Sequence, residues 1–209
     1  IYNILILVFY NERFIINRCR KLVDNNLKNG VDNMDKAKEA LWTKSFVLDT
    51  LINCLVFLIY YLLIVIIAVV AKDNLHATAS QAGLAVGIYI IGTVVARLLA
   101  GRFISVLGCR KMLYLGLFIY LASTAMYFYT PNLLMLDSVR FINGFAYGIT
   151  STATSTIIAA IIPQSRRGEG INYYGLSTSL AAAVGPFLGI LMLHSLGYDF
   201  IIAFCVALI

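Results

Sequence analysis

The sequence predicts an all-α polytopic membrane protein, and three observations support this fold class. First, 61% of its 209 residues are hydrophobic and only 12% are charged, with a mean hydropathy of +0.87. A water-soluble domain carries roughly a quarter charged residues, so this chain has too little polar surface to cover a soluble globule. Second, apolar runs long enough to cross a bilayer recur along the chain. Third, basic residues gather in alternate connections between these runs, as they do in membrane proteins with a fixed topology.

The apolar runs predict a transmembrane part that covers residues 46–209. A membrane-spanning helix needs about 20 mainly apolar residues. The first five runs reach that length, whereas the sixth is incomplete at Ile209. The connections between the runs are short, so neighbouring helices are expected to be antiparallel. The spans are expected near residues 46–71, 82–100, 112–129, 133–162, 171–193 and 198–209.

The basic residues beside these spans predict the orientation in the membrane. Alternate connections contain only Lys72 as a basic residue, whereas the other connections are rich in lysine and arginine. Because basic residues in short loops mark the cytoplasmic side, we expect a multi-pass protein of the cell (cytoplasmic) membrane with a cytoplasmic N-terminal segment, residues 1–45. The net charge of +6 then reflects topology beside the lipid bilayer, and no nucleic acid is expected as a partner. The basic residues of the cytoplasmic side are Lys36, Lys38, Lys44, Arg102, Arg110, Lys111, Arg166 and Arg167.

Residues 1–33 differ from the rest of the chain. IYNILILVFY is apolar but too short to span, and a polar, basic run follows it. An amphipathic or signal-like leader is one interpretation. We favour a second one, in which Met34 is the natural start, because MDKAKEALWTKSF resembles the short basic lead-in of many polytopic proteins.

The sequence offers no signal for a metal, a nucleotide cofactor or an enzyme active site. The four cysteines form no CxxC pair, and the two histidines stand alone in short connections. No Walker-type Gly-Lys-Ser/Thr sequence is present. The spans contain no histidine cluster, paired acids or nucleophile motif. We therefore expect neither a cofactor nor catalysis.

Three short stretches combine glycine with charged or polar residues in or between the spans. The first, GRFISVLGCRKM, is expected to form the turn between the second and third spans, where its glycines let two helices meet tightly. The second, RFINGFAYG, lies in the fourth span, and the third, GLSTSLAAAVGPFLG, lies in the fifth. Their distinctive residues are Gly101, Gly108, Arg110 and Lys111; Arg140, Asn143, Gly144 and Gly148; and Gly175, Gly185, Pro186 and Gly189.

Together these stretches resemble the motifs of the major facilitator superfamily of transporters. The first is similar to a signature loop of glycine, an acid four residues on, a second glycine and basic residues, although Ser105 stands in place of the acid. The second is similar to an Arg-x-x-Gln-Gly pattern, with Asn143 in place of the glutamine. The third is similar to the Gly-Pro motif of the family's proton-coupled exporters. The resemblance covers about Leu41 to Ile209 and implies the N-terminal six-helix half of a twelve-helix bundle, whose C-terminal half this chain lacks.

The resemblance implies a secondary active transporter of the drug/proton-antiporter-like exporter group. Such a protein would couple protons to the efflux of a small organic solute by alternating access, with binding near the bilayer midplane between two helical halves. Two alternatives stay open. One is a non-transporting membrane assembly or sensory protein, and the other is a major-facilitator importer of a sugar or metabolite.

Arg140 is the sharpest feature that the residues show without the family. A charged group inside a membrane span is costly and usually faces a partner or a watery cavity. Helical spacing places Asn143, Tyr147, Ser151 and Thr154 on one stripe with it, beside a stripe of small residues that can pack closely. We expect this stripe to line a transport path. The alternatives are that Arg140 reaches water at the end of the span or pairs with Asp137.

Three further expectations concern the other spans. Asp49 and Asn53 belong to a stripe that could line a cavity, together with Phe57, Tyr60 and Tyr61, although Asp49 could instead be an acid in the first helical turn. Gly185 and Pro186 are expected to shape a helix that flexes, with a bent but merely packed helix as the alternative. The tyrosines and phenylalanines elsewhere are expected to be membrane-interface anchors and lipid-facing residues.

Overall fold

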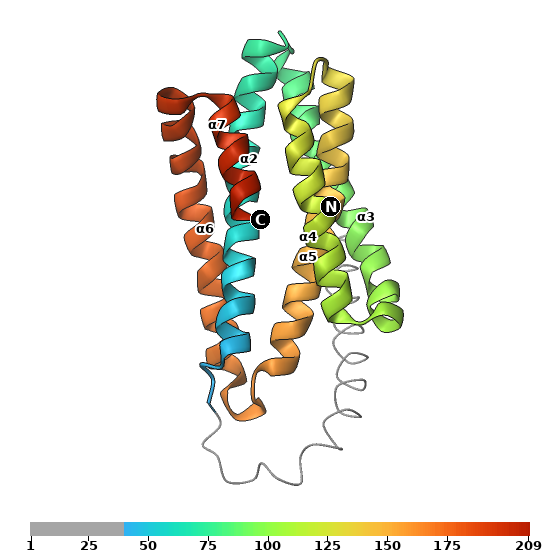
Figure 1. Ribbon diagram of the computed structural model, residues 1–209, viewed down its shortest axis with the longest axis vertical. Helices are drawn as coiled ribbons and strands as arrows, with labels where there is room; N and C mark the ends of the chain where they lie inside the picture. The colour runs from blue at the N-terminus through green and yellow to red at the C-terminus, as the bar shows by residue number, and fades with distance from the viewer. Residues whose placement is uncertain (1–39) are drawn as a thin grey trace.

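The computed structural model describes residues 40–209 (Figure 1), so the expectations for residues 1–33 and for Met34 as the start lie outside the described residues. The described part is helical, as the sequence predicted, and the helices are joined by short connections. The elements are α2 (Lys44–Asn74), α3 (Ala79–Leu107), α4 (Cys109–Ala125), η2 (Met126–Phe128), α5 (Leu133–Ile161), η3 (Gln164–Arg166), α6 (Arg167–Leu196) and α7 (Tyr198–Leu208).

The helices form two groups of three that stand side by side in Figure 1. In one group α5 packs against both α3 and α4, and in the other α2 packs against α6, with α7 beside them. The two groups meet where α2 touches α5 and α3 and where α7 touches α4. The turn between α3 and α4 and the connection between α5 and α6 lie at one end of the bundle, here named the basic end.

Four helical segments of the described part are long and apolar enough to cross a membrane. They are Lys44–Asp73, Ala79–Leu107, Cys109–Phe128 and Gln164–Leu196. The fourth predicted span forms α5, which is 29 residues long but less apolar, because serines and threonines fill its C-terminal half. Most of α5 is buried by its neighbours. Its polar side chains therefore face protein rather than lipid.

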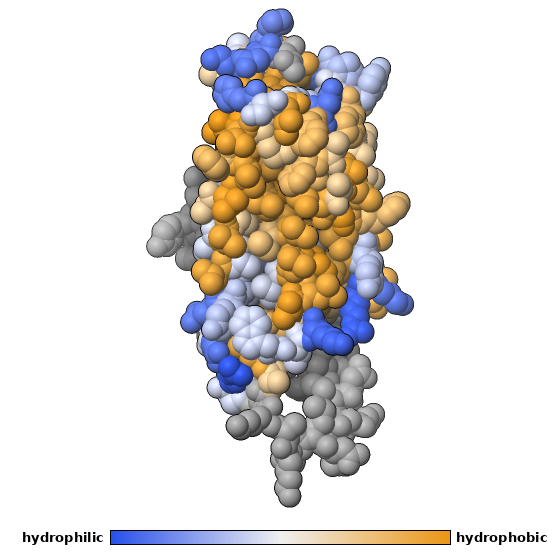
Figure 2. All heavy atoms as spheres, turned by 60° about the vertical axis from the view of Figure 1, so that its left-hand side comes forward, coloured by the Kyte–Doolittle hydropathy of each residue, from blue (hydrophilic) through white to orange (hydrophobic). Residues whose placement is uncertain are grey.

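The surface of the bundle has the pattern that a membrane imposes. Figure 2 shows a broad hydrophobic belt around the middle and hydrophilic residues at both ends. Large apolar side chains such as Phe118, Leu134 and Phe187 are exposed. Exposure on this scale is costly in water and favourable in lipid, so the described chain is a multi-pass membrane domain.

The helices extend beyond the apolar runs, and this corrects the expected turn at GRFISVLGCRKM. Residues 101–107 continue α3, and only Gly108 separates α3 from α4. Gly108 has φ +83° and its N–H donates to the carbonyl oxygen of Ile104 at 3.0 Å. This left-handed conformation favours glycine. A single glycine thus makes the reversal that a loop was expected to make.

The segment SRRGEG before the fifth span is also more helical than a solvated loop. Arg166 ends η3, and Gly168 to Gly170 already belong to α6. The Arg166 guanidinium pairs with Glu169 at 2.8 Å, and both side chains are partly exposed. An exposed pair of this kind contributes little stability. It lies at the start of α6 but does not account for the stability of that helix end.

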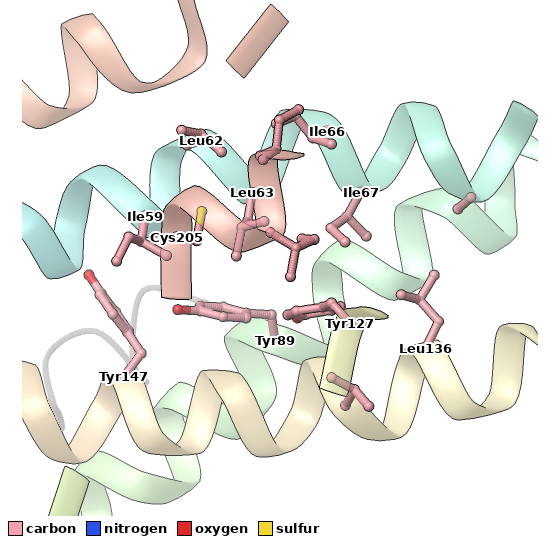
Figure 3. Packing of buried hydrophobic residues seen from close by; sticks show 14 of the residues in the cluster. Ile59, Leu62, Leu63, Ile66, Ile67, Tyr89, Tyr127, Leu136, Tyr147 and Cys205 are labelled. Atoms are coloured by element: carbon pink, nitrogen blue, oxygen red, sulfur yellow. The ribbon is translucent and has the colours of Figure 1, made fainter. Parts of the chain in front are cut away.

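The largest cluster of buried hydrophobic residues lies where the two groups of helices meet (Figure 3). Ile59, Leu63 and Ile67 of α2 face the rings of Tyr147, Tyr89 and Tyr127, which come from α5, α3 and η2. Tyrosines, rather than aliphatic residues alone, therefore form one wall of this core.

Candidate transport site

Helix α5 positions the candidate site because its small residues let α3 approach very closely. A Cβ at position 144 would overlap the backbone carbonyl of Tyr89, and one at position 148 would lie 2.7 Å from the carbonyl oxygen of Thr93. The Thr93 hydroxyl donates to the carbonyl oxygens of Tyr89 and Gly144, at 3.0 and 3.1 Å. The stripe of small residues predicted from the sequence is therefore the α3–α5 contact.

Arg140 lies inside this helix group and not at its surface. Its side chain is 1% exposed, and its Nε donates to the carbonyl oxygen of Ala85 at 3.2 Å. Its Cζ lies 4.8 Å from the ring centroid of Tyr89, within the range of a cation–π contact. Neither Nη atom has a hydrogen-bond partner within residues 40–209, and no ion pair joins Arg140 to Asp137. The structure thus shows neither alternative, exposure to water or pairing with Asp137.

Buried tyrosines lie beside the guanidinium or beside one another, and their burial corrects an expectation. Tyr89, Tyr120 and Tyr127 are each at most 2% exposed, although such tyrosines were expected at the membrane interface or facing lipid. Tyr127 lies beside Arg140, and Tyr120 lies beside Tyr89. None of the three hydroxyls makes a hydrogen bond of good geometry within the described chain. Sequence reasoning missed these residues because tyrosine content alone does not show which helix face is buried.

Asn143 joins α5 to α4 one helical turn from Arg140. Its Nδ2 donates to Ser123 Oγ at 2.9 Å and to Thr124 Oγ1 at 3.0 Å, and the side chain is fully buried. Both hydroxyls in turn donate to the carbonyl oxygen of Tyr120. Asn143 therefore fixes α4, and with it Tyr120, relative to Arg140.

Tyr147 lies in an aromatic layer between the two helix groups. Its ring centroid is 5.0 Å from that of Tyr60, 5.4 Å from Phe57 and 5.7 Å from Tyr89. Tyr60 is also stacked on Tyr89, at 5.2 Å. Tyr60 and Phe57 are only half-buried, so this aromatic layer extends from the buried rings of Tyr89 and Tyr147 to the surface of the described bundle.

Asn53 belongs to a second polar group, nearer the basic end. Its Nδ2 donates to Ser177 Oγ and Thr178 Oγ1, both at 3.2 Å, and its Oδ1 accepts from the Tyr174 hydroxyl at 2.8 Å. The Tyr174 oxygen also lies 3.1 Å from Thr154 Oγ1. One partly buried network therefore links α2, α5 and α6. The sequence pattern identified Asn53 but not its α6 partners, because they lie more than 120 residues away.

Asp49 is buried in α2, and its position excludes one of the two sequence interpretations. The helix begins at Lys44, two residues before the expected start, so Asp49 lies in the second turn and the first turn has no acid. The side chain is 4% exposed, and Oδ2 has no hydrogen-bond partner within residues 40–209. The helix dipole at the N-terminus therefore does not explain this carboxyl group.

The third motif places α6 directly on α2. A Cβ at position 185 would lie 2.7 Å from Tyr61 Cβ, and one at position 189 would lie 3.2 Å from the carbonyl oxygen of Leu62. Pro186 sits within a continuous α6. Gly175, at the start of the motif, has no atom within 4 Å of its Cβ position. Gly185 and Gly189 are thus required by packing, and Gly175 is not.

The first motif lies at the basic end, away from the buried clusters. Gly101 is half-buried within α3, and Arg110 and Lys111 are exposed in the first turn of α4. Ser105 Oγ donates to the carbonyl oxygen of Arg102 at 2.6 Å, a bond within its own helix.

The structure divides the predicted path residues into two sets. Arg140 and Asn143 lie on one side of Tyr147, and Asp49 and Asn53 lie on the other.

The comparisons with known proteins agree with this architecture. The family model described as Major Facilitator Superfamily matches residues 50–209. The chain belongs to the major facilitator superfamily. An uncharacterized MFS-type transporter of Methanocaldococcus jannaschii is 29% identical over 66% of this chain and 36% of its own length. An uncharacterized MFS-type transporter of Bacillus subtilis is 25% identical over 61% of this chain and 32% of its length. The monosaccharide-sensing protein 1 of Arabidopsis thaliana is 27% identical over 64% of this chain and 20% of its length.

Two of these three relatives are named as MFS-type transporters and one as a sensing protein. This major facilitator chain aligns with between a fifth and about a third of the length of these three relatives.

Proposed function

We propose that this chain forms the N-terminal helical half of a secondary transporter that exports a small organic solute across the cell membrane in exchange for protons. The observation that carries the proposal is Arg140, a cation that is 1% exposed and has no carboxylate partner within the described residues. Burying an unpaired charge costs several kcal/mol. A purely structural bundle gains nothing from that cost, whereas a transporter needs a charge at a site that opens and closes.

The aromatic layer supports the same proposal. Half-buried Tyr60 stacks on the buried ring of Tyr147, and half-buried Phe57 meets that ring edge-on, between the helix groups. Aromatic surfaces combined with few polar groups suit a small organic molecule. Binding at this depth, between two helical halves that rock against each other, is the arrangement of alternating access.

Export and proton coupling rest on the Gly185–Pro186 motif. This pair resembles the motif of the family's proton-coupled exporters, and its glycine lies against Tyr61 on the helix that carries Phe57 and Tyr60. A change in α6 would therefore reach the aromatic layer directly. The N-terminus is proposed to be cytoplasmic because the cations gather at the basic end.

A second candidate function is solute sensing without transport. The monosaccharide-sensing protein of Arabidopsis is among the relatives of this chain. A sensor would keep the buried cluster and the aromatic layer but would not move solute.

The deciding experiment uses the full-length gene product in sealed vesicles with an internal pH dye. Addition of a panel of organic anions, cations, sugars and neutral aromatics should produce proton flux with at least one class. Proton flux in the direction opposite to solute movement supports antiport. Solute uptake without proton flux would contradict proton coupling, and saturable binding with no movement of any solute would favour the sensor.

A further inference from the structure

Arg97 is a second cation inside a membrane-spanning helix, and no contact of the fold explains it. It lies ten residues before the end of α3 at Leu107, or about 15 Å along the helix axis at 1.5 Å per residue. Its side chain is half-buried, and within residues 40–209 it makes neither an ion pair nor a hydrogen bond. A charge inside a span usually faces a partner or a watery path.

The packing of α3 on α5 fixes the height of Arg97 in the bundle. A Cβ at position 148 of α5 would lie 2.7 Å from Ala96 Cβ and 2.7 Å from the carbonyl oxygen of Thr93. Arg97 directly follows Ala96, and Tyr147 directly precedes Gly148. Arg97 and Tyr147 therefore flank the same helix contact, at the level of the aromatic layer.

The side chain of Arg97 leans toward the aromatic layer and away from the basic end. Side chains in a helix tilt toward its N-terminus, and the C-terminus of α3 is at the basic end. Arg97 interacts electrostatically with Tyr60 and Tyr147, whose ring centroids are 5.0 Å apart. Reaching water at the basic end would take the guanidinium away from both tyrosines, so snorkelling does not account for it.

The groups around Arg97 are accessible and have spare donors. Arg97 and Tyr60 are both half-buried, so both reach the surface of the described bundle between the helix groups. The hydroxyls of Tyr60 and Tyr147 make no hydrogen bond within the part of the chain that the structure describes. Figure 3 shows the hydroxyl end of Tyr147 directed from α5 toward α2. A guanidinium and a flat aromatic face thus lie side by side, with no acid paired to the cation.

We propose that Arg97 binds the carboxylate of an aromatic solute whose ring rests on the aromatic layer. This inference rests on the proposed function, because the solute is the one that the protein exports. A guanidinium donates two parallel hydrogen bonds to a carboxylate, and such charge-assisted bonds are strong. The Tyr60 ring offers a face on which a second ring can stack offset or edge-on. The exported solute is then an aromatic acid in its anionic form, since a cation would be repelled by Arg97.

Binding to the full-length protein in detergent tests this site without any transport. The melting temperature is measured at constant ionic strength while sodium chloride is replaced by sodium benzoate. A ligand that binds the folded state raises the melting temperature in a saturable way. We expect a rise of a few degrees with benzoate, and none with benzamide or benzylammonium, which carry a neutral or a positive group on the same ring.

Two variants and one control assign the rise to the site. Arg97→Gln should abolish it, because a neutral amide cannot supply the charge-assisted pair. Tyr60→Leu, which removes the aromatic face, should shift its midpoint to several-fold higher benzoate concentration. Arg102→Gln, which removes an exposed cation at the basic end, should leave the rise unchanged. If Arg97→Gln does not fold, Tyr60→Leu decides, and an unchanged midpoint in that variant overturns the proposal.

The outcomes keep this site and the proposed function apart. No saturable rise with benzoate in the folded wild-type protein overturns the site, and it is the result expected if Arg97 pairs with an acid elsewhere in the full-length protein. A rise that persists in Arg97→Gln, or an equal rise with benzylammonium, overturns it as well. Proton-coupled export of a solute without benzoate binding would contradict the site alone, whereas benzoate binding without any transport would contradict the proposed function alone.

Discussion

Gly144 on α5 packs directly on the backbone carbonyl of Tyr89 on α3, so closely that no side chain could fit between them. The same contact places the Tyr89 ring under the guanidinium of Arg140, which is one helical turn from Gly144. A hydroxyl of Thr93 bonds both backbone oxygens and locks the two helices in register. The position of the buried charge thus depends on a glycine that carries no chemistry of its own.

Gly144→Ala is expected to destabilise the protein by about 1–3 kcal/mol, because the added Cβ forces α3 and α5 apart in a packed contact. The free energy of unfolding, measured by denaturant titration in detergent, checks this. Gly87→Ala on α3 is the matched control, because nothing lies within 4 Å of its Cβ position. Equal stability of the two variants would contradict the close α3–α5 contact.

The glycines of α6 should respond to alanine in a fixed order. Gly185→Ala would place a Cβ 2.7 Å from Tyr61 Cβ, Gly189→Ala would place one 3.2 Å from its nearest neighbours, and Gly175→Ala would meet open space. The melting temperature should fall most for position 185, less for position 189 and not at all for position 175. A larger fall for Gly175→Ala than for Gly185→Ala would show that α6 does not pack on α2 in this way.

Asn143→Ala should weaken the α4–α5 contact only modestly. Interhelical hydrogen bonds in membrane proteins contribute on average about 0.6 kcal/mol, and Ser123 and Thr124 keep their own acceptor, the Tyr120 carbonyl oxygen. We expect a loss of about 1 kcal/mol in the free energy of unfolding. Asn172→Ala, an exposed amide on α6, is the control and should change nothing. A loss above about 3 kcal/mol would indicate that Asn143 supports more than these two bonds.

The hydrogen bond from Tyr174 to Asn53 can be measured by a double-mutant cycle. Tyr174→Phe removes the hydroxyl and keeps the ring, and Asn53→Ala removes the acceptor. The coupling energy between the two changes should lie near 0.6 kcal/mol and below about 1.7 kcal/mol. Tyr173→Phe, an exposed neighbour that packs on Trp42, should show no coupling to Asn53. A coupling of zero for Tyr174 would remove the link between α2 and α6.

Much of the fold could be predicted from the sequence because membrane helices are coded by local composition. Each apolar run became a helix, and the small residues of α5, such as Gly148, became a helix contact as expected. The helix ends could not be predicted to the residue, because a helix continues past the hydrophobic core until a backbone such as that of Gly108 stops it. For this reason GRFISVL was predicted from the sequence to lie in a turn, whereas the structure shows it as the last part of α3.

The candidate site was only partly visible in the sequence. Arg140 was conspicuous because a charge inside a span is rare, and Asn143 followed from helical spacing. Tyr89 and Tyr127 were not found, because tyrosine is common at membrane surfaces and only the packing of α3 on α5 shows that these rings are buried. Partners such as Asn53 and Tyr174 are brought together only by the tertiary fold.

The most direct test of the account is transport by the full-length protein with and without the charge at position 140. Solute-driven proton flux in vesicles is compared for wild type, Arg140→Ala and Arg102→Ala, each at equal amounts of folded protein. We expect at least a tenfold loss of flux for Arg140→Ala and no change for Arg102→Ala, which removes an exposed cation. Wild-type flux in a folded Arg140→Ala protein would contradict a role for the buried arginine in transport.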